Sequence, residues 1–133
     1  MPKPVYKRYR AVDLVSLFPP DVLTAFNVLQ ILYKANPEAP VTAGMLFTNH
    51  MISTVDARYV LLKLAHQGII DSVRSPYAGY VFKSEIAETK TGIDVMKAFK
   101  VFLESPSGFT RASDRINAAL YDALNVSLKE LIE

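Results

Sequence analysis

Apolar side chains recur every three or four residues along much of this chain, a spacing that gathers them on one face of an α-helix. The spacing predicts helices over residues 21–35, 43–49, 54–67, 93–104 and 114–124, and a short last turn that carries Leu128, Leu131 and Ile132. Residues 69–73 and 79–82 instead hold β-branched and aromatic residues on either side of a polar tip, which predicts a β-hairpin. The expected fold class is mainly α with a small β-hairpin.

Polar side chains stand where these helices are expected to begin. The candidate N-caps, whose oxygens would accept hydrogen bonds from free backbone N–H groups, are Asp21, Thr42, Ser53 and Ser127. Asp56 and Glu130 follow the two serines by three residues, as in a capping box, and Gly68 suits the position after a helix end. Residues 50–52 interrupt the apolar pattern. The order helix, short helix, break, capped helix, glycine and hairpin is that of a winged helix-turn-helix.

The helix after Ser53 is the candidate recognition helix. Its core-facing side holds Ala57, Leu61 and Leu64, and the opposite side holds Val55, Arg58, Tyr59 and Leu62, with His66 on the same line. An arginine pairs bidentately with guanine in the major groove, so Arg58 is the candidate base reader. The alternative for Arg58 is a solvated surface charge.

Other side chains of this helix suit further DNA contacts. Val55 could touch a thymine methyl group, and Thr54 or Tyr59 could bond to a phosphate. Leu62 is expected to pack under the hairpin or the N-terminal arm, because a leucine gains little from facing DNA.

The first twenty residues differ in composition from the rest of the chain. They hold four of the eight prolines and show no clean period, so residues 1–20 are expected to form an arm. Lys3, Lys7, Arg8 and Arg10 stand there without an acidic neighbour, whereas residues 84–133 carry a net charge of −2. This asymmetry suits contact with a polyanion such as DNA, and a solvated tail is the alternative.

Several function classes are excluded or disfavoured by composition. The 133 residues include no cysteine, which excludes disulfides and thiolate metal sites, and only His50 and His66 are histidines. No glycine-rich phosphate loop, zinc-protease motif or nucleophile elbow occurs, so an enzyme is not expected. No cofactor or metal is expected either. The chain has no long apolar run and no signal-peptide core, so we expect a cytoplasmic protein without membrane contact.

The segment VTAGMLFTNHMISTVDARYVLLKLAHQGIIDSVRSPYAGYVF resembles the IscR/NsrR-type regulators of the Rrf-two family. That family has Ile-Ser at the start of its recognition helix, then Lys-Leu, then Gly-Leu or Gly-Ile, then a wing that reads SVRGPGGGY. The residues at matching positions here are Ile52, Ser53, Lys63, Leu64, Gly68, Ile69, Ser72, Val73, Arg74, Pro76, Gly79 and Tyr80. The likeness covers about 100 residues, from Asp21 to the end of the chain.

The resemblance implies roles for particular residues. Residues 73–80 would be the wing, in which Arg74 takes the place of a DNA-contacting arginine and Ser75 and Tyr77 form the tip. Ser53, Arg58 and Tyr59 match positions from which the family's recognition helix reads DNA. The final long helix would form a dimer through an apolar face comprising Ile116, Ala119, Leu120, Ala123 and Leu124. From the residues alone, the same face could equally be core.

Two departures from the family bear on function. Its sensing members hold an iron–sulfur cluster through three cysteines before the last long helix, but residues 105–113 contain none here, so no cluster is expected. Tyr77 replaces a wing glycine, and it could stack on a sugar or fill a cleft of the protein itself.

The cluster of Phe99, Phe102 and Phe109 could line an effector site, although core packing is the preferred interpretation.

Together these features predict three regions. Residues 1–20 form a basic arm whose Lys7, Arg8 and Arg10 enter the minor groove, 21–84 a winged helix-turn-helix, and 85–133 a helical dimerisation region. The predicted function is a dimeric, sequence-specific DNA-binding transcriptional regulator, acting as a repressor on a pseudo-palindromic operator. The alternative is a winged-helix protein–protein interaction module that does not read DNA, which would suit the modest net charge and aromatic wing tip.

Overall fold

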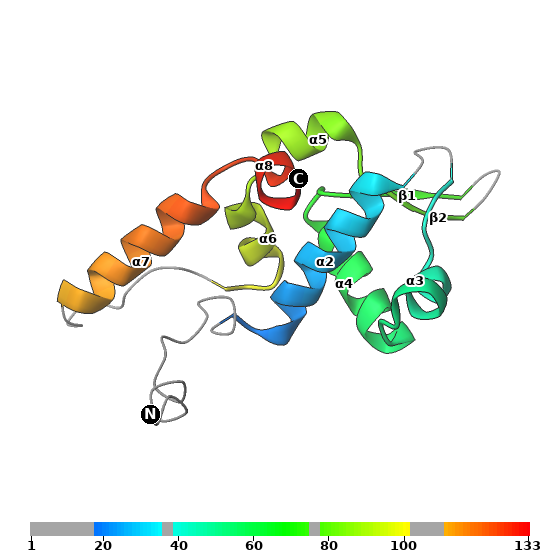
Figure 1. Cartoon of the computed structure of the whole chain (residues 1–133), viewed down its shortest axis with the longest axis horizontal. Coiled ribbons are helices and arrows are strands. Elements are labelled where there is room, and N and C mark those ends of the chain that lie inside the picture. The colour runs from blue at the N-terminus through cyan, green and yellow to red at the C-terminus, as the bar shows by residue number, and fades with distance from the viewer. Residues whose placement is uncertain (1–17, 36–38, 75–77, 102–110) are drawn as a thin grey trace, which may run out of the picture.

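The computed structural model describes residues 18–35, 39–74, 78–101 and 111–133. Its elements along the chain are α2 (Pro20–Lys34), α3 (Ala43–His50), α4 (Thr54–His66), β1 (Asp71–Val73), β2 (Gly79–Val81), α5 (Ser84–Thr89), α6 (Gly92–Ala98), α7 (Arg111–Leu124) and α8 (Leu128–Ile132). Figure 1 shows α2 crossing the middle of the molecule, α3, α4 and the hairpin on one side of it, and α7 extending to the opposite side. The prediction of a mainly helical chain with one small hairpin is confirmed.

Helix α2 begins without a side-chain cap. Pro19 is the N-cap residue and Pro20 occupies the first helical position, where a missing N–H breaks no intrahelical hydrogen bond. The N–H groups of Val22 and Leu23 donate to the Pro19 carbonyl at 3.0 and 3.3 Å. The prediction that Asp21 caps this helix is therefore wrong, and Asp21 lies in the first turn, where its charge favours the helix dipole.

The helix-turn-helix has the predicted caps. Thr42 Oγ1 accepts from the Met45 N–H at 3.1 Å and starts α3, and Ser53 Oγ accepts from the Asp56 N–H at 3.1 Å and starts α4. Between them Met51 adopts a left-handed backbone with φ 58°, which makes the turn sharp. The left-handed Met51 and the Ser53 cap therefore fix where α3 ends and α4 begins.

The end of α4 is closed by a Schellman motif. Gly68, at φ 76°, donates its N–H to the Ala65 carbonyl, and Ile69 donates to the Leu64 carbonyl, both at 3.0 Å. The chain then enters β1 at once. Gly68 therefore fixes the direction in which the hairpin leaves α4.

The hairpin is antiparallel, with Asp71 opposite Val81 and Val73 opposite Gly79. Val41, just before α3, adds a bridge to Tyr80, whose N–H and carbonyl both pair with it at 2.9 and 3.0 Å. At Gly79 a β-carbon would stand 2.7 Å from Pro40 Cβ, and φ is 150°, so only glycine fits there. The base of the wing is thus attached to the segment that starts α3.

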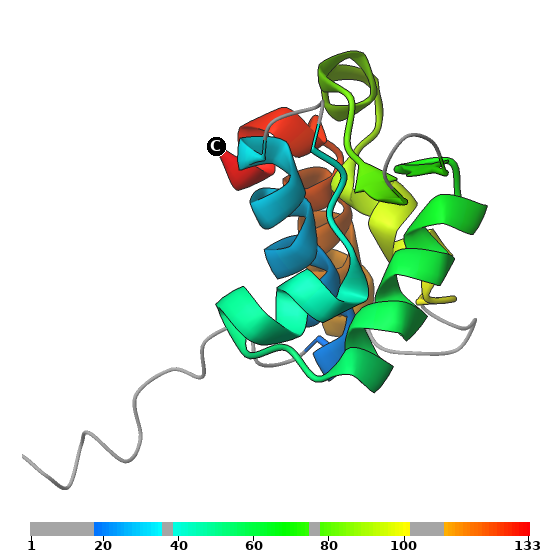
Figure 2. The same ribbon diagram turned by 90° about the vertical axis from the view of Figure 1, so that its right-hand side faces the viewer.

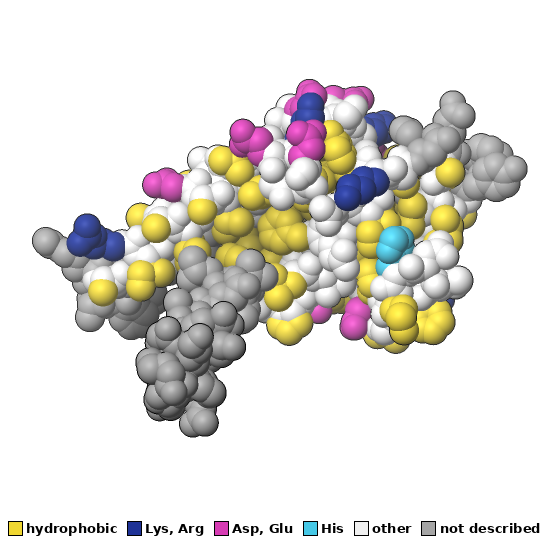
Figure 3. All heavy atoms as spheres, in the orientation of Figure 1, with side chains coloured by type: hydrophobic (Ala, Val, Ile, Leu, Met, Phe, Trp, Pro, Cys, Tyr) yellow, Lys and Arg dark blue, Asp and Glu magenta, His cyan; other side chains and the backbone are white. Residues whose placement is uncertain are grey.

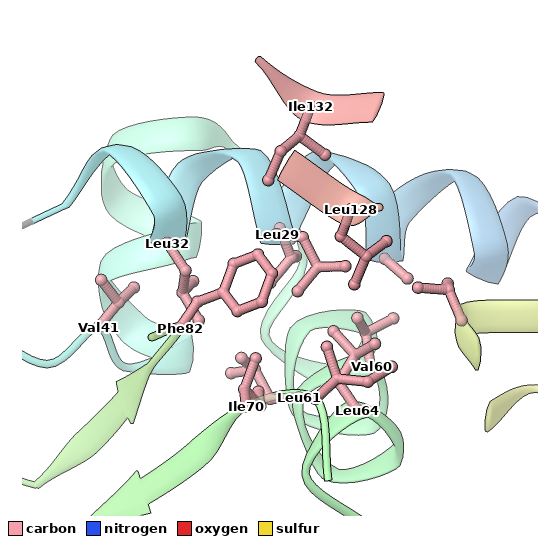
Figure 4. Close-up of a cluster of buried hydrophobic side chains, with 14 of the residues drawn as sticks. Leu29, Leu32, Val41, Val60, Leu61, Leu64, Ile70, Phe82, Leu128 and Ile132 are labelled. Atoms are coloured by element: carbon pink, nitrogen blue, oxygen red, sulfur yellow. The ribbon is translucent and has the colours of Figure 1, made fainter. Parts of the chain in front are cut away.

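A shared core joins both halves of the chain. Figure 4 shows Leu29 and Leu32 of α2 facing Val60, Leu61 and Leu64 of α4, with Phe82 of the hairpin end and Leu128 and Ile132 of α8 closing the sides. Leu29, Leu61 and Leu64 are essentially inaccessible to solvent. A second cluster, composed of Val22, Ile93, Met96 and Leu124, joins α2 to α6 and to the end of α7. The C-terminal helices therefore help to hold the recognition helix in place.

Two helices differ from the sequence prediction. Helix α5 was not predicted; it is six residues long, has no side-chain cap and buries only Ala87, so no apolar period can be seen in it. Helix α6 ends at Ala98 rather than near residue 104. Lys100 takes a left-handed conformation at φ 58°, and Val101 donates its N–H to the Met96 carbonyl at 2.9 Å, which closes α6 with a second Schellman motif.

The last two helices confirm the prediction and extend it. Helix α7 starts three residues before the predicted start at 114, and α8 is capped by Ser127, whose Oγ accepts from the Glu130 N–H at 3.2 Å. A β-carbon on Gly92 would stand 2.8 Å from the Leu124 carbonyl oxygen, so α6 lies close to the α7–α8 turn. None of the helices within the described ranges is long and apolar enough to cross a membrane.

Candidate nucleic-acid interface

The surface formed by α3, α4 and β1 holds most of the described candidate DNA contacts. Figure 2 faces this side and shows α3 and α4 meeting at their turn in front of α2. Ala57, Val60, Leu61 and Leu64 are buried against α2, which leaves the other side of α4 open. Val55 is 77% exposed and Arg58 is also exposed, as the periodicity predicts. The guanidinium of Arg58 can therefore reach a molecule that approaches α4 from outside.

Ser53 and Thr54 lie at the start of the recognition helix. Ser53 is exposed, and its hydroxyl oxygen is used to cap the helix. Thr54 is half-buried in the first turn. The helix dipole adds a partial positive charge at this end, which favours a phosphate group near these residues.

Tyr59 has partners within the chain. Its ring lies 6.1 Å from the ring of Phe99, at the end of α6, and Lys63 Nζ stands 5.4 Å from the ring centroid. The first contact is an aromatic pair and the second a cation–π interaction, and both restrict the ring. Tyr59 thus links the recognition helix to α6, while its remaining 44% exposure leaves part of the ring accessible. Phe102 and Phe109, named with Phe99 as a possible effector site, lie outside the described residues.

Leu62 keeps about half of its side chain accessible, at 51% exposure. The hairpin tip at 75–77 and residues 1–17 of the arm lie outside the described residues, so its expected packing under the hairpin or the arm stays a prediction. Leu62 stands four residues after Arg58 on the same open side of α4, and a leucine there adds an apolar area to the surface.

The wing is described at its base only. Arg74 directly follows β1 and is exposed. Asp71 and Lys83 form an exposed ion pair at 3.5 Å near the foot of the two strands, so Asp71 is partly neutralised. Ser75 and Tyr77 of the tip, and Lys7, Arg8 and Arg10 of the arm, lie outside the described residues.

Apolar side chains at the helix-turn-helix were missed by the sequence reasoning. Phe47 on α3 is half exposed, and Met51 in the turn is 89% exposed. The spacing gave no signal for them, because Met51 falls in the break and a short helix does not define a face. Together with Val55 and Leu62 they make the outer surface of the helix-turn-helix more apolar than its charges suggest.

The predicted dimer face lies on a helix that contacts little of its own chain. Ile116 is 57% exposed, Ala119 and Ala123 are exposed and Leu120 is half-buried, whereas Leu124 is only 8% exposed. Leu124 therefore belongs to the chain's own core beside Val22. Figure 3 shows hydrophobic side chains along the helix that projects from the body and across the surface at its base.

A groove lies at the base of α7. It has a volume of about 390 Å³ and is lined mostly by apolar side chains, among them Phe18, Leu23, Phe26, Leu124 and Leu131. Sequence reasoning did not find it, because its walls come from α2, α7 and α8. The apolar face of α7 and this groove together form a continuous region that water would solvate poorly.

Comparison with solved structures identifies the architecture. CymR, the global cysteine regulator of B. subtilis, superposes with a TM-score of 0.71 over 86% of this chain and 95% of CymR, at 20% sequence identity. The fold is that of CymR. CymR of Staphylococcus aureus gives a TM-score of 0.68 at 22% identity over 97% of its length, and a putative transcriptional regulator from Listeria innocua gives 0.68 at 20% over 84%.

The likeness to CymR confirms the winged helix-turn-helix prediction and extends the resemblance seen in the sequence to the fold. No protein-family model matches the chain, and no curated protein matches it. The shared fold is therefore seen at only 20–22% sequence identity.

Proposed function

We propose that this protein is a sequence-specific DNA-binding transcriptional regulator that acts as a homodimer in the cytoplasm. One observation carries the proposal: on a winged helix-turn-helix, Arg58 stands exposed on the open side of α4, and a second exposed arginine, Arg74, directly follows β1 at the base of the wing. Proteins of the same fold include the regulator CymR. The pair of arginines offers one contact to a base edge and one to the backbone.

The recognition step follows from the helix geometry. The start of α4 enters the major groove, where Arg58 donates two hydrogen bonds to O6 and N7 of a guanine and Val55 contacts a thymine methyl group. Ser53, Thr54 and Tyr59 contact phosphates, and the wing residues Arg74, Ser75 and Tyr77 contact the flanking backbone or minor groove. Lys7, Arg8 and Arg10 of the arm supply further positive charge.

A dimer follows from the exposed apolar face of α7. Two copies would pair through Ile116, Ala119, Leu120 and Ala123, and a two-fold axis would place the two α4 helices in successive major grooves, about 34 Å apart. The preferred operator would be a pseudo-palindrome. We propose that occupancy of this operator blocks transcription, which makes the protein a repressor, and that no iron–sulfur cluster takes part.

The test is selection of the purified protein against a random DNA duplex pool, followed by binding of the enriched sequence at several salt concentrations. We expect a two-fold-related motif, a steep salt dependence from displaced counterions, and a loss in Arg58→Ala of about 1–3 kcal/mol of binding free energy. Lys129→Ala on α8 is the matched control, because it also removes one positive charge, but from a side chain that pairs with Glu88 of α5 and is not on the open side of α4. Equal losses in both variants would contradict the assignment of Arg58.

The arm is tested by deletion of residues 1–10. Removal of its four basic residues should weaken binding and lower the slope of the logarithm of affinity against the logarithm of salt concentration. An unchanged slope would show that the arm makes no phosphate contact.

A second function is favoured by the apolar surface of the helix-turn-helix. Phe47, Met51, Val55 and Leu62 are all at least half exposed, which would suit a winged helix that binds another protein. The same selection separates the two functions. Absence of any enriched motif, with weak binding that does not change with salt, would favour the protein-binding module.

A further inference from the structure

A pocket between α2 and α3 has no part in the proposed DNA contacts. It has a volume of about 490 Å³, within the range of small-molecule sites, and it is partly open to solvent. Its walls come from two helices and from the segment that enters α3. Its lining includes no residue of α4, the helix that holds Arg58.

The pocket has an apolar interior. Ile31, Ala35, Val41 and Met45 line it, and Val41 is only 5% exposed. Met45 is partly exposed at 39% and stands on the α3 wall. A ligand here would remove apolar surface from water, which favours a ligand with an apolar body.

The opening of the pocket is polar and carries positive charge. Lys34 and Asn27 stand on the α2 side, Asn49 and His50 on the α3 side, and all four are exposed. No acidic side chain occurs among the described residues that line the pocket. Gln30 also lines it, and its Nε2 donates to the Ile132 carbonyl at 3.1 Å, which orients that amide. Every polar side chain of the lining can donate a hydrogen bond.

We propose that this pocket binds a small organic acid with an apolar body. The apolar part would lie against Val41 and Met45, and the carboxylate would stand at the opening between Lys34 and His50. A carboxylate accepts hydrogen bonds only, so it matches a lining that offers donors and a positive charge. An amine or other cation would meet Lys34 with no compensating acid among the described lining residues.

Binding at this place would act on the recognition helix. His50 is the last residue of α3, and Met51 and Ser53, which follow it, belong to the turn that leads into α4. A carboxylate held by both Lys34 and His50 would fix the end of α3 against α2. This consequence, unlike the binding itself, rests on the proposed function in DNA recognition.

The experiment uses phenylacetate as the probe and the methionine methyl groups of the full chain as reporters. Of the three methionines within the described ranges, only Met45 lines the pocket; Met96 is buried in α6 and Met51 is exposed in the turn. With isotope-labelled methionine methyl groups, the NMR signal of Met45 should shift in a saturable way with added phenylacetate. The neutral analogue phenylacetamide should bind more weakly, because it lacks the charge.

Variants test the charged opening. The double variant Lys34→Gln with His50→Gln should bind phenylacetate about fivefold more weakly, as expected for partly exposed charge-assisted hydrogen bonds. Lys97→Gln, a surface lysine of α6 outside the pocket lining, should bind as the wild type. No saturable shift of Met45, equal affinity for acid and amide, or equal affinity in the double variant would each overturn the proposal.

The effect on DNA is measured separately. Affinity for the selected operator should change at saturating phenylacetate in the wild type and not in the double variant. A saturable Met45 shift without any change in operator affinity would leave the binding site standing and overturn its role in regulation. Failure to select an operator would count against the proposed function, and the Met45 titration would still decide the pocket.

Discussion

At the scale of the residue, Gly79 shows how one position fixes the wing. Its φ of 150° is strained for other residues, and a β-carbon would collide with Pro40 from the segment before α3. The sequence indicates a hairpin around this glycine, yet the collision partner lies far away along the chain. The reason for glycine is therefore visible only in the fold.

Gly79→Ala should lower the free energy of unfolding by about 1–3 kcal/mol, because both the backbone strain and the contact with Pro40 oppose alanine. The check is urea denaturation followed by circular dichroism. Gly44→Ala is the matched control: its new β-carbon would meet only Thr42 Oγ1, at an ordinary 3.7 Å, so stability should stay the same or rise. If the two variants unfold at the same urea concentration, the close approach at Gly79 does not contribute to the free energy of unfolding.

Ser53 caps α4 and is also proposed to contact a phosphate, and substitution can separate these two roles. Its hydroxyl oxygen caps α4, so Ser53→Ala should cost about 1 kcal/mol of unfolding free energy. Aspartate caps a helix as well as serine, so Ser53→Asp should restore most of that stability. The added negative charge at the helix start should still weaken DNA binding, because it repels phosphate. Wild-type operator affinity in Ser53→Asp would contradict the phosphate contact at this position.

At the scale of the element, sequence reasoning succeeded where the signal is local. Thr42, Ser53 and Ser127 each cap the helix that follows, by accepting a hydrogen bond from the backbone N–H three residues later. The apolar period of α4 fixes which of its sides faces α2. The sequence does not predict a helix or a helix end that no repeating spacing of side chains marks. Helix α5 is too short to show a period, and α6 ends because Lys100 adopts a conformation that lysine rarely favours.

At the end of α6, glycine substitutions at two nearby positions should change the free energy of unfolding in opposite directions. Lys100 holds a left-handed conformation that costs an L-residue about 1–2 kcal/mol, so Lys100→Gly should raise the free energy of unfolding by up to about 1 kcal/mol. Lys97→Gly makes the same change three residues earlier, inside the helix, and should lower it by about 1 kcal/mol. Urea denaturation of both variants is the measurement, and destabilisation by Lys100→Gly would contradict the Schellman ending.

Only the part of the candidate site that depends on local helix geometry could be predicted from the sequence. The open side of α4, with Val55 and Arg58, follows from helix geometry alone. The Tyr59–Phe99 contact, the exposure of Leu62 and the pocket between α2 and α3 depend on how separate segments pack. None of these has a counterpart in the spacing of residues along one helix.

At the scale of the whole molecule, the helix-turn-helix and the C-terminal helices share one core. Leu128 and Ile132 of α8 pack with Leu29 of α2 and Leu64 of α4, and Ile93 of α6 packs with Val22. A change at α6 can therefore reach α4 through packed side chains, and Tyr59 against Phe99 adds a direct contact. What the core does not cover is most of the apolar face of α7, which is where a second copy would bind.

The dimer can be tested on that face without disturbing the core. Ile116 is exposed and Leu120 half-buried, so Ile116→Asp with Leu120→Asp places two charges where the proposed partner packs, and burying them unpaired would cost several kcal/mol. Light scattering should show a monomer, or the protein should become insoluble, and the soluble monomer should lose affinity for the two-fold operator. Ala118→Asp, at an exposed position on the opposite side of α7, should leave the dimer intact. A dimer of unchanged mass in the double variant would place the interface elsewhere, since no pair of helices could accommodate four charges at its centre.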